Sequence, residues 1–61
     1  MALKESKVEV KQIFATNDLD ELNKLVETYL NDGWELLDVR VLQMDFYNMK
    51  FSMFYVFSRK K

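Results

Sequence analysis

The sequence contains no cysteine and no histidine, and Gly33 is its only glycine. Without these residues the chain cannot form a disulfide, a zinc site of the usual ligand type, or a Ser–His or Cys–His nucleophilic pair. A single glycine also excludes a glycine-rich phosphate-binding loop. We therefore expect no catalytic residue, no metal site and no cofactor, and we expect that the protein is not an enzyme.

Long apolar runs and a charge excess are missing as well. No run approaches the roughly 20 apolar residues needed to span a bilayer. Residues 1–6 (MALKES) have no apolar region typical of a secretory signal. The net charge of −1 gives no general attraction to nucleic acid or to an anionic membrane. These observations predict a cytoplasmic protein without a membrane partner.

What remains is the composition of one small folded domain. The 61 residues are 49% hydrophobic and 31% charged, which is typical of a folded chain and not of a disordered one. Domains of this size bury only about 60% of the surface that the unfolded chain exposes, and many are marginally stable. With neither disulfides nor metal to stabilise the fold, dense packing or oligomerisation must do so.

The clearest element is a helix over Leu19–Leu30. Asp18, or Asn17, can accept hydrogen bonds from the first free N–H groups, and Glu21 has capping-box spacing from Asp18. Gly33 predicts a left-handed residue just after the helix. Apolar residues recur at spacings of three and four and form one stripe: Leu19, Leu22, Leu25, Val26, Tyr29 and Leu30.

Alternating segments before and after this helix predict three strands. The first covers Lys7–Phe14, where Val8, Val10 and Phe14 share one face. Gln12 and Ile13 break the alternation, which indicates a bulge or a frayed edge, and Ala15–Asp18 reads as a turn.

The second strand covers Trp34–Met44 and the third Met49–Ser58, with a turn at Asp45–Asn48. Both strands carry apolar residues on two faces. In the second strand one face holds Leu37, Val39 and Val41, and the other holds Trp34, Leu36, Leu42 and Met44.

The predicted fold is α+β, in the order β-α-β-β, with one helix packed on one face of a three-stranded, mainly antiparallel sheet. The third strand is the most apolar, so we place it in the centre and expect the order 1-3-2. The alternative places strands 1 and 2 side by side and parallel. Residues 7–58 would form the domain, after a flexible N-terminus (1–6) and before a basic tail (59–61).

One helix covers one face of such a sheet. We expect it to pack on the odd-numbered side chains of the third strand. Phe54 and Val56 then lie on the other face, where a monomer would expose an apolar patch. We therefore expect a homo-oligomer that associates through this face or through an edge strand, with a two-fold dimer favoured. In the alternative, a twisted sheet curls over its own second face. The interface candidates are Trp34, Leu36, Leu42, Phe54 and Val56. For Trp34 the alternative is a place in the helix–sheet core.

Charged residues offer two further interpretations. Asp18, Asp20 and Glu21 cluster, but helix capping explains them. Glu35 and Asp38 are expected to be solvated or paired across strands with Arg40 or Lys50. Aromatic residues with basic residues nearby are also typical of nucleotide and nucleic-acid sites. One face of these aromatics is needed for the core and the net charge is slightly acidic, so the core interpretation is preferred and the ligand site is the alternative. The candidates for that site are Arg40, Tyr47, Lys50, Phe54 and Arg59.

The run from Leu19 and Leu22 to Leu30-Asn31-Asp32-Gly33-Trp34-Glu35-Leu36 resembles a group of short bacterial and phage domains of unknown function. The resemblance covers Val8–Phe57 and implies the same β-α-β-β arrangement, a bacterial or phage source and no catalytic residues. It adds two options, which are binding of a host protein and sequestration of a small nucleotide.

The function expected from the sequence is therefore non-enzymatic. It is a self-associating domain that acts through protein–protein interaction, for example as a phage-encoded modulator of a host factor. The alternative is an oligomer that binds a nucleotide or nucleic acid.

Overall fold

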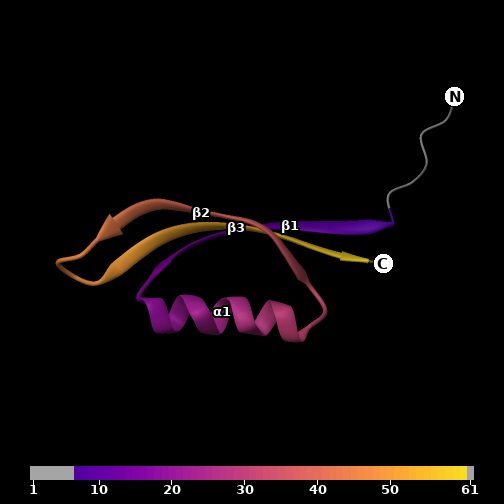
Figure 1. The fold of residues 1–61 in the computed structure, drawn as a ribbon, viewed down its shortest axis with the longest axis horizontal. Helices are drawn as coiled ribbons and strands as arrows, with labels where there is room; N and C mark the ends of the chain where they lie inside the picture. Colours follow the sequence, from indigo (N-terminus) through magenta and orange to yellow (C-terminus); the bar gives the residue numbers. More distant parts are fainter. Residues whose placement is uncertain (1–6, 61) are drawn as a thin grey trace, which may run out of the picture.

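The computed structural model describes residues 7–60, and the expected flexible segment 1–6 lies outside that range. Four elements follow one another: β1 (Val8–Asn17), α1 (Leu19–Asn31), β2 (Glu35–Asp45) and β3 (Lys50–Lys60). The strands form one layer and the helix lies under it as a second layer (Figure 1). The predicted α+β class and element order are confirmed.

The sheet has the order β1-β3-β2, and β3 pairs antiparallel with both neighbours. Strand β3 carries apolar residues on both of its faces. The central position suits it, because neighbouring strands on both sides shield a central strand from solvent more than an edge strand. The predicted order 1-3-2 is therefore confirmed, and the parallel alternative is wrong.

Strand β1 is longer and more regular than the sequence suggested. Its pairing with β3 runs without a shift from Val8 opposite Lys60 to Asn17 opposite Phe51. The expected bulge or frayed edge at Gln12 and Ile13 is therefore wrong. The expected turn at Ala15–Asp18 shrinks to Asp18 alone. The alternation is unbroken: Ile13 and Ala15 pack against the core under the sheet.

The start of α1 is capped as predicted. The Asp18 carboxylate accepts a hydrogen bond from the Glu21 backbone N–H at 2.9 Å. The reciprocal half of the capping box is absent, because the Asn17 side-chain oxygen accepts from the Asp18 N–H at 2.9 Å and the Glu21 carboxylate pairs with Lys24. One free helix N–H is thus satisfied by the side chain that comes directly before the helix.

The end of α1 is a Schellman motif around Gly33, whose φ is 86°. The Trp34 N–H donates to the Tyr29 carbonyl at 3.0 Å and the Gly33 N–H donates to the Leu30 carbonyl at 3.2 Å. The rings of Tyr29 and Trp34 meet edge to face, with centroids 6.2 Å apart. The two hydrogen bonds and this ring contact fix the turn from the helix into β2. The predicted role of Gly33 as the left-handed residue after the helix is confirmed.

The core lies between α1 and the odd-numbered side chains of β3, as expected. Its buried members are Leu22, Trp34, Phe51, Tyr55 and Phe57. A helix of 13 residues is about 20 Å long, whereas a strand of 11 residues reaches about 36 Å. The sheet therefore extends past the helix at both ends (Figure 1), and Leu19 and Leu30 at the ends of the helical stripe stay about half exposed.

Two register shifts in β2, at Leu36/Asp38 and Val41/Gln43, change which side chains face the helix. A bulge inserts one extra residue and so reverses the alternation beyond it. The two face sets expected for this strand are therefore wrong. On the helix side, four β2 residues lie opposite odd-numbered β3 residues: Leu36, Val39, Val41 and Met44.

Arg59 and Lys60 belong to β3 and are not a basic tail. The Arg59 guanidinium lies over the Trp34 ring, 4.4 Å from its centroid. It also forms ion pairs with Glu9 at 3.3 Å and with Asp32 at 3.1 Å. Arg59 thus joins β1, β3 and the end of α1.

Candidate functional site

The face of the sheet away from α1, here called the open face, carries an uncovered apolar strip. Directly opposed residues in an antiparallel pair share a face, and Phe14 is opposite Phe54, Gln12 opposite Val56 and Val10 opposite Ser58. The strip consists of Val10, Phe14, Phe54 and Val56. No helix or strand of the described residues lies over this face (Figure 1).

Phe14 and Phe54 form the centre of this strip. Their rings meet at 6.5 Å with an interplanar angle of 63°, the edge-to-face geometry that aromatic pairs prefer. Phe14 is nevertheless 68% exposed and Val10 61% exposed, while Phe54 and Val56 are half-buried. The pair therefore supports the local sheet but leaves most of the Phe14 ring in solvent.

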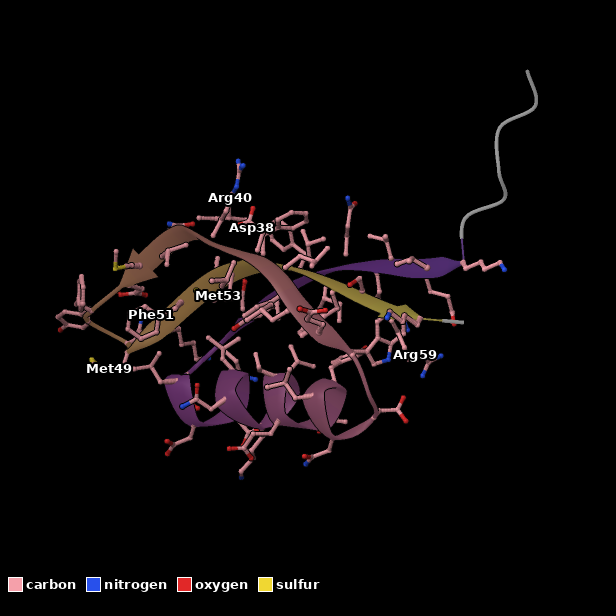
Figure 2. All side chains as sticks on the ribbon, turned by 45° about the vertical axis from the view of Figure 1, so that its right-hand side comes forward. Asp38, Arg40, Met49, Phe51, Met53 and Arg59 are labelled. Atoms are coloured by element: carbon pink, nitrogen blue, oxygen red, sulfur yellow. The ribbon has the colours of Figure 1, made fainter. Side chains whose placement is uncertain are left out.

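Strand β2 contributes a polar border to the open face. Its bulges place Asp38 opposite Val56 and Arg40 opposite Phe54, and the two charged side chains pair at 3.3 Å. Figure 2 shows both on the side of the sheet away from α1. Asp38 therefore pairs with Arg40 as expected, but the expectation that the pair would join two strands is wrong, because both residues belong to β2.

Charge on the open face is balanced. Cross-strand pairing assigns three acidic and three basic residues to it: Glu35, Asp38, Asp45, Arg40, Lys50 and Lys60. An apolar strip with a border of mixed charge is the usual anatomy of a protein interface.

The five residues expected at an interface do not lie together. Phe54 and Val56 are on the open face, but Trp34 is buried in the helix–sheet core and Leu36 packs against that core. Leu42 lies at a bulge of the edge strand β2 and is 49% exposed. Sequence reasoning missed Phe14 and Val10 as open-face residues, although their alternation with Ile13 and Ala15 was the available signal.

The residues expected at a nucleotide or nucleic-acid site are also dispersed. Tyr47, 96% exposed, lies in the β2–β3 turn, and Lys50 is opposite Asp45 beside it. Arg59 lies about 30 Å away along β3, near the C-terminal end of the helix (Figure 2). Arg40 and Phe54 lie opposite each other on the open face, but the structure does not bring the five candidates into one site.

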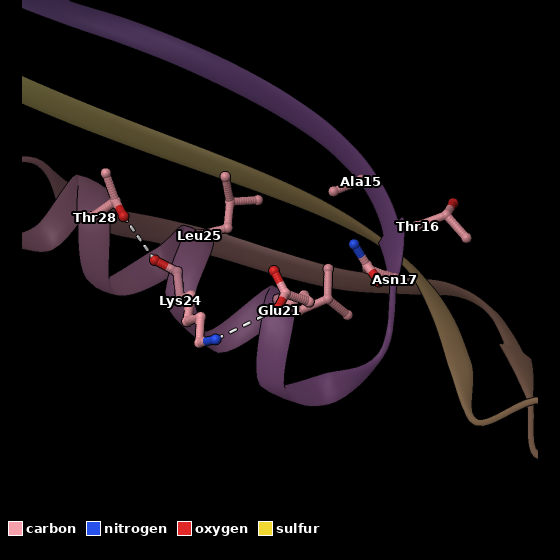
Figure 3. Close-up of a pocket in the computed structure, with 8 residues that line it drawn as sticks. Ala15, Thr16, Asn17, Glu21, Lys24, Leu25 and Thr28 are labelled. Carbon is pink, nitrogen blue, oxygen red and sulfur yellow. Dashed lines mark hydrogen bonds and ion pairs between the residues drawn. The ribbon is translucent and has the colours of Figure 1, made fainter.

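A second surface feature is a groove between the end of β1 and α1 (Figure 3). Its volume is about 320 Å³. Ala15 and Leu25 line it with apolar atoms, and the Glu21–Lys24 ion pair of 3.5 Å lies along the helix side. The remaining lining residues are Thr16, Asn17, Leu22 and Thr28.

Among residues 7–60, two titratable side chains have shifted pKa values, and both shifts have structural causes. Hydrogen bonds from the side chain and backbone of Asn48 lower the pKa of Asp45 below its usual 3.8, with a further contribution from the Tyr47 N–H. Burial raises the pKa of Tyr55 above its usual 10.0. Asp45 thus organises the β2–β3 turn, and Tyr55 belongs to the core.

Within residues 7–60 no group of three acidic side chains is placed to hold a metal ion. No helix in this range is both long and apolar enough to cross a bilayer. No family model, curated protein or solved structure matches the chain. The open face and the groove are therefore interpreted from their own geometry.

Proposed function

We propose that this protein is a non-enzymatic interaction domain that self-associates through its open face. The single observation that carries the proposal is the Phe14–Phe54 pair, which lies on the face that α1 does not cover. In the bacterial or phage setting that the resemblance implies, the assembled domain would modulate a host protein by binding it.

The size of the open face fits a second copy of the chain. Three strands about 4.8 Å apart and about 36 Å long present a face of roughly 500 Å². Two such faces would bury roughly 1,000 Å², which is close to the lower limit for a specific interface. Balanced charges at the border avoid net repulsion between copies, and a two-fold axis brings identical strips together.

The test uses Phe14→Lys and measures mass by light scattering over a range of micromolar concentrations. The wild-type chain is expected as a dimer, at twice its 7.4 kDa mass. Phe14 is mostly exposed within one chain, so the substitution leaves the monomer folded. Each dimer interface loses two buried rings worth about 1.5–3 kcal/mol apiece. The dissociation constant of the dimer should therefore rise by roughly a hundredfold or more.

Tyr47→Lys is the matched control, because it also replaces an exposed aromatic ring by lysine but lies in the β2–β3 turn. It should leave the mass unchanged. A wild-type chain that stays at 7.4 kDa throughout, or a Phe14→Lys chain that associates as well as wild type, contradicts the proposal.

A further inference from the structure

The two edges of the sheet differ in regularity. At one edge, β2 is interrupted by two register shifts, and bulges hinder pairing with another strand. At the other edge, β1 keeps an unbroken register with β3 over its whole length and contains no proline. A regular edge strand offers its outer N–H and C=O groups for pairing with another strand. The edge open to strand addition is therefore that of β1.

The groove lies directly beside this edge, at the C-terminal half of β1. Ala15 faces the helix side, and because its side chain is small, space remains between it and Leu25 (Figure 3). Thr28 closes the helix side of the groove, where its hydroxyl donates to the Lys24 carbonyl at 2.8 Å. A strand added at Gln12–Asn17 would place alternate side chains into this groove.

We propose that an extended, uncharged peptide segment of a partner protein binds here as a fourth strand, beside Gln12–Asn17 and with its alternate side chains in the β1–α1 groove. Backbone pairing at an edge with side-chain pockets beside it is an established mode of peptide recognition. The groove favours small or medium apolar side chains, because Ala15 and Leu25 line it and the nearby charges of Glu21 and Lys24 already neutralise each other.

A single strand fits this edge better than a second copy of β1. Only Asp18 separates β1 from α1, so a second β1 would bring its own helix against the first one. The helix surface that it would meet is polar, with Glu21, Lys24 and Thr28. The inference does not rest on self-association, since Ala15 and Phe14 lie on opposite faces of β1.

The probe is a displayed library of random linear peptides, selected against the full chain. We expect selection of proline-free peptides with alternating apolar residues. With the ¹⁵N-labelled chain, the best peptide should shift the amide resonances of Gln12–Asn17 and of Leu25 and Thr28. Methylating the backbone nitrogens of this peptide one at a time should weaken binding about tenfold at alternate positions, since each methyl removes one strand hydrogen bond.

Thr28→Phe fills the groove from an exposed helix position and should weaken the peptide about tenfold. Asn23→Phe is the matched control, because Asn23 is also exposed on α1 but does not line the groove. Circular dichroism should show both variants folded. Phe54→Ala should retain peptide binding even where it abolishes self-association, which separates this inference from the proposed function.

Four results would overturn the inference: no peptide is selected, backbone methylation has no effect, the shifts map to Phe14 and Phe54, or Thr28→Phe binds as tightly as Asn23→Phe. If groove variants alter the mass of the chain while no peptide binds, the occupant of the β1 edge is a second copy and the peptide proposal is wrong.

Discussion

The two faces of β3 carry similar side chains but lie in different surroundings. On the helix side, Phe57 is fully buried and Tyr55 is 4% exposed. On the open face of the same strand, Phe54 and Val56 are only half-buried, and their neighbour Phe14 on β1 is 68% exposed. The comparison teaches that a residue's apolar character does not decide its burial in a two-layer domain; the position of the single helix does.

The largest effect is expected from a substitution on the helix side of the sheet. Phe57→Ala removes the fully buried ring that stacks on Tyr29, with centroids 4.9 Å apart. We expect a loss of about 3–5 kcal/mol in the free energy of unfolding, from lost transfer energy and the cavity left behind. Urea denaturation followed by tryptophan fluorescence measures it, since Trp34 belongs to the same core. A loss below about 1 kcal/mol would mean that the helix side is not the true core.

A smaller effect tests how α1 is held on that face. Gly33→Ala forces a β-carbon onto a residue with a φ of 86°. The added carbon would lie 3.9 Å from the Arg59 Cδ, an ordinary contact, so the cost is conformational and about 1–2 kcal/mol. Gly33→Asn should cost less in the same thermal unfolding measurement, because asparagine tolerates the left-handed region. Equal losses would point to steric crowding as the cause.

The open face should respond differently to the same type of truncation. Phe54→Ala removes the edge-to-face contact with Phe14 and should cost one chain about 1 kcal/mol. If the open face pairs two copies, the wild-type melting temperature rises with protein concentration and that of Phe54→Ala does not. A loss as large as that of Phe57→Ala, without any concentration dependence, would show that the two faces are equivalent within one chain.

The sequence predicts the elements of this fold better than it predicts their faces. The Asp18 cap and the Gly33 stop are local hydrogen-bonding features, and both helix ends could be located from them. The central place of β3 followed from its apolar residues on both faces. These features depend on residues close together in the chain or on one strand alone.

The faces of β1 and β2 depend on distant partners. In β1 alternation places Val8, Val10 and Phe14 on one face, but it does not say which face lies against the helix. In the structure Ile13 and Ala15 pack toward the helix. In β2 the two bulges arise from pairing with β3, and strict alternation cannot reveal them. The groove was missed for the same reason, because Ala15 had been assigned to a turn.

The smallest expected effect concerns the β2–β3 turn, which lies beyond the cover of α1. Hydrogen bonds from Asn48 lower the pKa of Asp45, so the folded state favours the ionised carboxylate. The resulting stabilisation is present above the ordinary value of 3.8 and disappears as the pH falls through the lower folded pKa. Amide exchange at Tyr47 and Asn48, whose N–H groups donate to Asp45 at 3.0 and 3.1 Å, should therefore quicken on acidification below about pH 4.

Asp45→Asn keeps an acceptor oxygen but loses the titration, so its exchange should show a flatter pH response once the intrinsic rates are subtracted. If the wild-type and Asp45→Asn chains show the same pH dependence of exchange, backbone pairing of β2 with β3 holds the turn. The stability of the hairpin would then not depend on the Asp45 carboxylate.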